Sequence, residues 1–101
     1  MNDVDAIEKA VTELERLPVT QLTLPRSRMF RDDLGRVCPV TFLQDAMARP
    51  GDLYGFTPFD EFLQFCHTSM WELVNLYDSA TGREKGRMRV VARIREWLAT
   101  P

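Results

Sequence analysis

The chain has 101 residues and a formal net charge of −2, with 45% hydrophobic and 28% charged residues. These values are typical of a soluble globular protein, and the length suits one domain, 1–101, with one hydrophobic core. No stretch approaches the ~18 apolar residues that a membrane span requires, and the acidic N-terminus lacks the pattern of a signal peptide. Two cysteines are too few for a disulfide framework, so we expect a cytoplasmic protein with reduced thiols.

The N-terminal segment predicts a helix over residues 3–17. Apolar residues recur there every three or four positions, which places them on one face, and Pro18 ends the pattern. Residues 18–31 are expected to be irregular, because Pro25 interrupts any long strand.

A turn is predicted at residues 32–35, where the sequence Asp-Asp-Leu-Gly favours one. This turn leaves a small hairpin open as an alternative, in which residues 29–31 would pair with residues 36–38. A second helix is expected from Pro39 to about Ala48, since proline suits the first helical turn.

The next segments predict a loop followed by two helices. The loop 49–56 carries apolar residues and is expected to fold onto the core. A helix then begins after Thr57, with Pro58 in its first turn. After a short break at 67–69, a helix over 70–77 is predicted from a possible capping box between Ser69 and Glu72. A single continuous bent helix is the alternative.

The last helix is expected to begin near Arg83 and to pack through an apolar stripe in its second half. Together these elements predict a mainly α fold: a compact bundle of four or five short helices, with or without one small β-hairpin near 29–38.

Seven of the ten aromatic residues lie between Tyr54 and Tyr77. They are Tyr54, Phe56, Phe59, Phe62, Phe65, Trp71 and Tyr77. Aromatic side chains carry the largest apolar areas, so this stretch is predicted to form the centre of the core. The almost wholly apolar run at 73–77 is typical of a helix that is buried on several sides.

Few residues offer the chemistry of an active site. The soft metal ligands are Cys38, Cys66 and His67, whereas a structural zinc site needs four ligands. Cys66 and His67 are neighbours, so on a helix their side chains point ~100° apart and do not form a thiol–imidazole pair. No phosphate-binding glycine loop or nucleophile motif is present. We therefore predict a non-enzymatic protein with no metal and no cofactor.

The C-terminal segment is the only basic part of the chain. Residues 83–101 carry six bases and two acids, whereas residues 1–16 and 17–82 each have a net charge of −3. The candidate partner-binding residues are Arg83, Lys85, Arg87, Arg89 and Arg93. Three interpretations stay open: a solvated face, a protein-binding surface, or phosphate binding by a nucleic-acid accessory protein.

Two of these arginines are unusual in their position. On a helical projection Arg83 and Arg87 fall on the same side as the apolar stripe. They are therefore expected either to pair with acids inside the protein, such as Asp78 or Asp52, or to reach a partner.

Two short motifs resemble a known family. Asp33, Gly35, Arg36 and Cys38 are similar to a D-x-G-R-x-C turn, and the segment 76–83 is similar to an N-D…G-R linker. Together they resemble a family of small, mainly helical, uncharacterised bacterial proteins over roughly thirty residues. The chain differs from that family at Tyr77, where the linker usually has asparagine, and in its arginine-rich segment 83–95. The resemblance implies a helical fold and no particular activity.

The sequence thus favours a non-enzymatic intracellular interaction protein of bacterial or phage type, which binds a protein partner or itself. The alternative is a nucleic-acid-binding accessory protein that uses the arginine-rich helix. No membrane association is expected.

Overall fold

The computed structural model describes residues 3–27, 29–51 and 56–99. Its helical elements are α1 (Asp3–Arg16), the short 3₁₀ helix η1 (Val19–Gln21), α2 (Pro39–Met47), α3 (Pro58–Phe65), α4 (Met70–Asp78) and α5 (Arg83–Ala99). The predicted mainly α bundle is therefore confirmed, and the described residues form five α-helices in a compact arrangement. None of the helices in these three ranges is long and apolar enough to cross a membrane.

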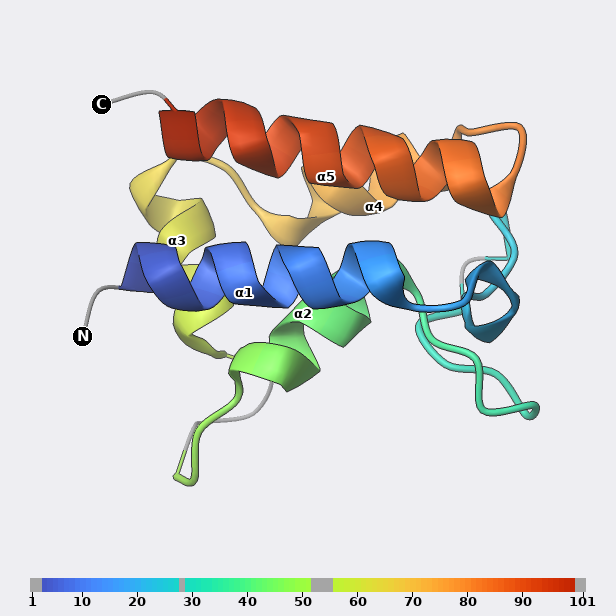
Figure 1. Ribbon diagram of the computed structural model, residues 1–101, viewed down its shortest axis with the longest axis horizontal. Coiled ribbons are helices and arrows are strands. Elements are labelled where there is room, and N and C mark those ends of the chain that lie inside the picture. Colours follow the sequence, from blue (N-terminus) through green and yellow to red (C-terminus); the bar gives the residue numbers. More distant parts are fainter. Residues whose placement is uncertain (1–2, 28, 52–55, 100–101) are drawn as a thin grey trace.

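Helix α1 lies at the centre of the bundle, where it contacts α2, α3 and α5. In Figure 1, α1 and α5 lie side by side and run in opposite directions, and α4 lies behind α5. The contact between α4 and α5 is the most extensive in the bundle. Consequently α5 is held between α1 and α4, and the side chains along its length face two different helices.

The core is mainly aliphatic. Its fully buried members come from every α-helix and include Ile7, Leu14, Leu43, Leu63, Leu73 and Ile94. Among the aromatic residues that the structure describes, only Phe59 and Tyr77 are buried members of this cluster. The prediction that the aromatic stretch forms the centre of the core was wrong for Phe56, Phe65 and Trp71, which are 39%, 83% and 56% exposed. Tyr54 lies outside the described residues.

Helical geometry explains why Phe65 and Trp71 are exposed. Residues advance by about 100° each, so Phe65 lies about 120° around α3 from the buried Phe59. Trp71 lies about 200° around α4 from Leu73, on the opposite side of that helix. The apolar run of α4 is thus buried on one side only.

No strand forms in the part of the chain that the structure describes, so the alternative hairpin near 29–38 is reduced to a turn. Val37 makes isolated bridges to Arg31 and to Leu22. The amide of Asp32 donates to the carbonyl of Arg36, which closes the predicted turn. Since Val37 is shared between two neighbours and Pro39 begins a helix directly afterwards, neither pairing extends into a ladder.

The predicted start of α3 is confirmed in detail. The Thr57 side chain accepts from the amide of Phe59, and the Asp60 carboxylate accepts from the amide of Thr57 in a capping box. At the other end, the amide of Thr68 donates to the carbonyl of Leu63, and His67 adopts a positive φ of 57°. A residue in the left-handed conformation commonly ends a helix, and His67 has this role at the end of α3. The predicted break between α3 and α4 is therefore confirmed.

The capping box predicted between Ser69 and Glu72 does not form. Ser69 precedes α4, but its side chain makes no capping hydrogen bond. The Glu72 carboxylate instead accepts from Thr68 Oγ1 at 3.0 Å and from Arg93 Nε at 2.7 Å. The predicted packing of the loop 49–56 onto the core is wrong for Phe56, which is 39% exposed. For residues 52–55, with Leu53 and Tyr54, it stays a prediction, because they lie outside the described ranges.

Candidate functional site

Arg87 joins the last helix to the first. Its residue is only 8% exposed, and its Nη1 donates to the backbone carbonyls of Leu14, at 3.2 Å, and Leu17. Its Nη2 pairs with Glu84 Oε2 at 2.6 Å. The guanidinium therefore supplies donors to the C-terminal end of α1, where carbonyls lack partners within the helix and a positive charge is favourable.

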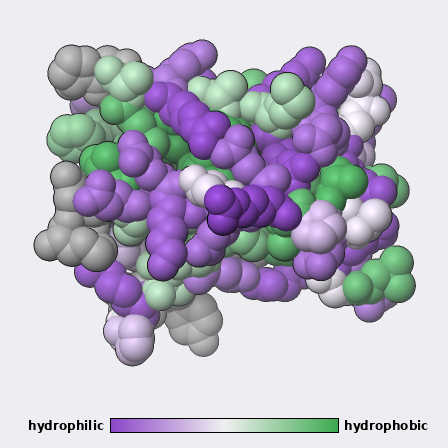
Figure 2. Space-filling view, viewed as in Figure 1, coloured by the Kyte–Doolittle hydropathy of each residue, from purple (hydrophilic) through white to green (hydrophobic). Residues whose placement is uncertain are grey.

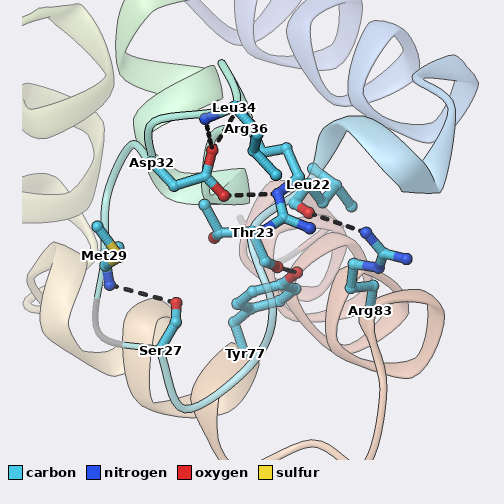
Figure 3. Close-up of polar contacts among 9 residues, drawn as sticks. All are labelled: Leu22, Thr23, Ser27, Met29, Asp32, Leu34, Arg36, Tyr77 and Arg83. Carbon is cyan, nitrogen blue, oxygen red and sulfur yellow. Dashed lines mark hydrogen bonds and ion pairs between the residues drawn. The ribbon is translucent and has the colours of Figure 1, made fainter.

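Arg83 holds the segment that follows η1. Its Nη1 donates to the carbonyl of Leu22 at 3.3 Å, as Figure 3 shows. Next to it, the hydroxyl of Tyr77 donates to the carbonyl of Thr23. Burial raises the pKa of Tyr77 to about 12, so the phenol keeps the proton that this hydrogen bond needs. Residues 22–23 are thus fixed against α4 and α5.

The positive charge of Arg93 is balanced by two carboxylates. Its Nε and Nη1 pair with Glu72 and Glu96, each at 2.7 Å, and its guanidinium lies 4.8 Å from the centre of the Trp97 ring. The hydrogen bond with Glu72 raises the pKa of Arg93, and the same bond lowers the pKa of Glu72. This guanidinium therefore contributes little unbalanced positive charge to the surface.

Lys85 and Arg89 are the exposed cations of the predicted set. Arg89 Nη1 lies 3.4 Å from Ser79 Oγ, a weak contact at the surface. The five candidate residues are thus divided among different environments: two donate to backbone carbonyls, one is paired twice and two face solvent. Figure 2 shows that the face of the molecule with α1 and α5 is mostly hydrophilic, with separate hydrophobic areas toward its sides.

The more distinctive surface feature lies between α4 and the segment 29–38. Here a hollow of about 440 Å³ is lined by residues of both elements, and we refer to it as the Trp71 groove. Its lining residues are Met29, Phe30, Cys38, Trp71, Val74, Asn75, Tyr77 and Asp78. Sequence reasoning missed this groove, because it assigned Trp71 to the core.

Two aromatic residues in contact, Phe30 and Trp71, line the Trp71 groove. The rings of Phe30 and Trp71 have centroids 6.1 Å apart and planes inclined at 52°. Both residues remain largely exposed, at 40% and 56%, and Met29 beside them is 46% exposed. Cys38 and Tyr77 are buried, so they form the base of the groove. The groove thus combines a buried base with an exposed apolar wall.

The loop that carries Phe30 is held in place by local polar contacts. Asp32 Oδ1 accepts from the amides of Leu34 and Arg36, at 3.0 and 2.9 Å, and its Oδ2 pairs with the Arg36 guanidinium (Figure 3). Burial alone would raise the pKa of Asp32, but these hydrogen bonds outweigh it and leave the pKa below its usual value. Since the turn is held in this way, the wall of the groove is preformed.

Potential metal ligands are dispersed. Across residues 3–27, 29–51 and 56–99, no three side chains of the His, Cys, Asp or Glu type lie close enough to hold one metal ion. Cys38 and Cys66 are both free thiols. The Cys38 sulfur accepts from the amide of Thr41 at 3.4 Å, so it caps α2.

No family model, no curated protein and no solved structure shows significant similarity to the chain. The resemblance to small helical bacterial proteins therefore stays a prediction.

The contribution of the hydrogen bond from Tyr77 to the Thr23 carbonyl can be tested by substitution. Changing Tyr77→Phe removes the donor to the buried Thr23 carbonyl, so we expect a loss of about 1–2 kcal/mol in the free energy of unfolding, measured by urea denaturation. Thr23→Val is the matched control, because the buried Thr23 hydroxyl has no partner among the described residues. That change should be neutral or stabilising. Equal losses in the two variants would contradict the assignment.

Proposed function

We propose that this protein is a non-enzymatic binding protein whose Trp71 groove holds a segment of a partner protein. The observation that carries the proposal is the Phe30–Trp71 pair, whose tilted rings are in contact and are exposed beside a preformed hollow. Large apolar side chains in contact with water lower the free energy when a partner covers them. Tryptophan and other aromatic residues also contribute most of the binding energy in many interfaces.

The dimensions of the groove favour a peptide segment as its occupant. A hollow of about 440 Å³ is at the small end of the range for ligand pockets and accommodates one or two large side chains. The lining is mainly apolar, with polar groups at Asn75 and Asp78. A groove of this kind suits an apolar anchor residue of a partner, with polar groups that orient the neighbouring chain.

The lining gives little support for catalysis. Cys38 is its nucleophilic side chain, and its sulfur serves as the cap of α2. Among the described residues of the lining there is no histidine or lysine that could activate the thiol as a general base. The proposal of a binding function without chemistry is therefore the simpler one.

The arginine-rich helix gives less support for nucleic-acid binding. Arg87 donates to carbonyls inside the protein, and Arg93 is paired with two carboxylates. Arg95 pairs with Glu15 of α1 at 2.5 Å. Binding to a phosphate backbone would require these guanidinium groups to exchange their present partners, so the alternative function has the weaker physical basis.

A displayed library of random short peptides tests the proposed function. The wild-type protein should enrich peptides that contain a large apolar residue, and Trp71→Ala should lower their affinity by about tenfold or more, because the principal aromatic contact is lost. Trp71 is exposed, so circular dichroism of the variant should match that of the wild type. Affinity is measured by fluorescence anisotropy of the enriched peptides.

Phe65→Ala provides the matched control. Phe65 is an exposed aromatic residue that is not part of the groove lining, and its removal should leave peptide affinity unchanged. The proposal fails if no peptide is enriched above the bare support. It also fails if Trp71→Ala and Phe65→Ala have the same effect.

A further inference from the structure

Asp78 is the acidic group of the Trp71 groove. It is the last residue of α4, it is half-buried, and it lines the hollow. Its Oδ1 accepts from the backbone amide of Arg26 at 3.3 Å. Among the described residues no cationic side chain forms an ion pair with it, and the guanidinium of Arg83 donates to a carbonyl instead.

The contrast with the other acid of α4 is informative. Glu72 lies in the first turn, where a negative charge is favourable, and it is paired with Arg93. Asp78 lies at the C-terminal end, where the helix carbonyls already create a negative potential. A half-buried carboxylate in that position costs stability and strengthens the local negative field. Among the described residues no ion pair offsets the cost of burying the Asp78 carboxylate. Such a cost is expected where a binding partner supplies the positive charge.

We propose that the segment bound in the Trp71 groove carries a lysine or arginine beside its apolar anchor. The anchor would pack against Phe30 and Trp71, and the cation would pair with the Asp78 carboxylate. Partial burial strengthens such a pair, because the local dielectric is lower than that of water. An arginine would gain further from stacking on the exposed indole of Trp71. This inference rests on the proposed function and specifies the chemistry of the partner.

The test compares peptide selection by the wild type and by Asp78→Asn. Asparagine keeps an oxygen that can accept from the Arg26 amide, so the loop contact is preserved while the charge is removed. The wild type should enrich lysine or arginine within a few positions of the apolar anchor. Asp78→Asn should keep the preference for the anchor, lose the preference for the cation, and bind the wild-type peptides about 3- to 10-fold more weakly.

Asp33→Asn is the matched control. Asp33 is exposed on the neighbouring turn and is not part of the groove lining, and this substitution changes the net charge by the same amount. It should leave both the selected sequences and the affinity unchanged. In addition, added salt should weaken binding to the wild type more than binding to Asp78→Asn, since salt screens the charge pair.

The outcomes separate the two proposals. Peptides with an apolar anchor but without basic enrichment, or with acidic enrichment, would overturn the inference and leave the proposed function intact. Absence of any enriched peptide would overturn both. A second copy of the chain as the occupant would appear in sedimentation equilibrium as a dimer that Trp71→Ala abolishes, and this result would overturn the assignment of a basic partner segment.

Discussion

Replacing Gly86 with alanine should lower the free energy of unfolding by about 1–3 kcal/mol, although alanine is the better helix former. A Cβ at this position would lie 2.5 Å from Cδ1 and 2.8 Å from Cε1 of Tyr77, well inside van der Waals contact. The ring cannot withdraw easily, because Tyr77 is only 2% exposed and its hydroxyl is bonded to the Thr23 carbonyl. The absence of a side chain at Gly86 therefore sets how closely α5 approaches α4.

Urea denaturation of the variant provides the measurement, and Lys85→Ala is its control. Lys85 is exposed on the same helix, so its replacement should change stability by no more than about 0.5 kcal/mol. The steric origin of the loss is tested with the double variant Gly86→Ala and Tyr77→Leu. If the clash with the ring is responsible, the double variant should be more stable than the sum of the two single effects predicts. Strict additivity would exclude that cause.

Replacing Arg87 with methionine should cost about 2–4 kcal/mol of stability. Methionine has a similar length and fills much of the same volume, but it has no donor for the carbonyls of Leu14 and Leu17. The C-terminal end of α1 would then lose both hydrogen bonds and the nearby positive charge, while the site remains closed to water. Thermal and urea unfolding, followed by far-ultraviolet circular dichroism, measure the loss.

Arg89→Met is the matched control for this substitution. Arg89 lies on the same helix, and its weak contact with Ser79 Oγ is exposed to solvent. The same chemical change there should alter stability by no more than about 0.5 kcal/mol. If the two methionine variants were equally stable, Arg87 would not have the structural role assigned to it here.

Local signals in the sequence predicted the helices well. The periodic apolar residues of 3–17 and the proline that follows are sufficient to define α1. The start of α3 was also predictable, because Thr57, Pro58 and Asp60 form a capping pattern within four consecutive residues. The Ser69 pattern has the same form but fails, since Arg93 and Thr68 compete for the Glu72 carboxylate. Arg93 is distant in sequence, so no local rule includes it.

The candidate site was less predictable. The projection of α5 correctly identifies Arg83 and Arg87 as unusual. Among the described residues neither pairs with Asp78, and Asp52 lies outside the described ranges. Their main acceptors are instead backbone carbonyls of Leu22, Leu14 and Leu17. Because every residue carries a carbonyl, no pattern of side chains reveals such a partner. For the Trp71 groove a signal did exist: the angle between Trp71 and Leu73 on a helical projection places the tryptophan opposite the core.

The bonds from Arg87 to Leu14 and Leu17 span 73 and 70 positions of the chain. A ribosome synthesises α1 first, so its last turn stays without these donors until residue 87 has been added and has left the exit tunnel. Nascent chains that are arrested before this point should hold α1 in a frayed, protease-sensitive state. The last turn of α1 is therefore expected to become stable only once α5 has been synthesised and has packed against it.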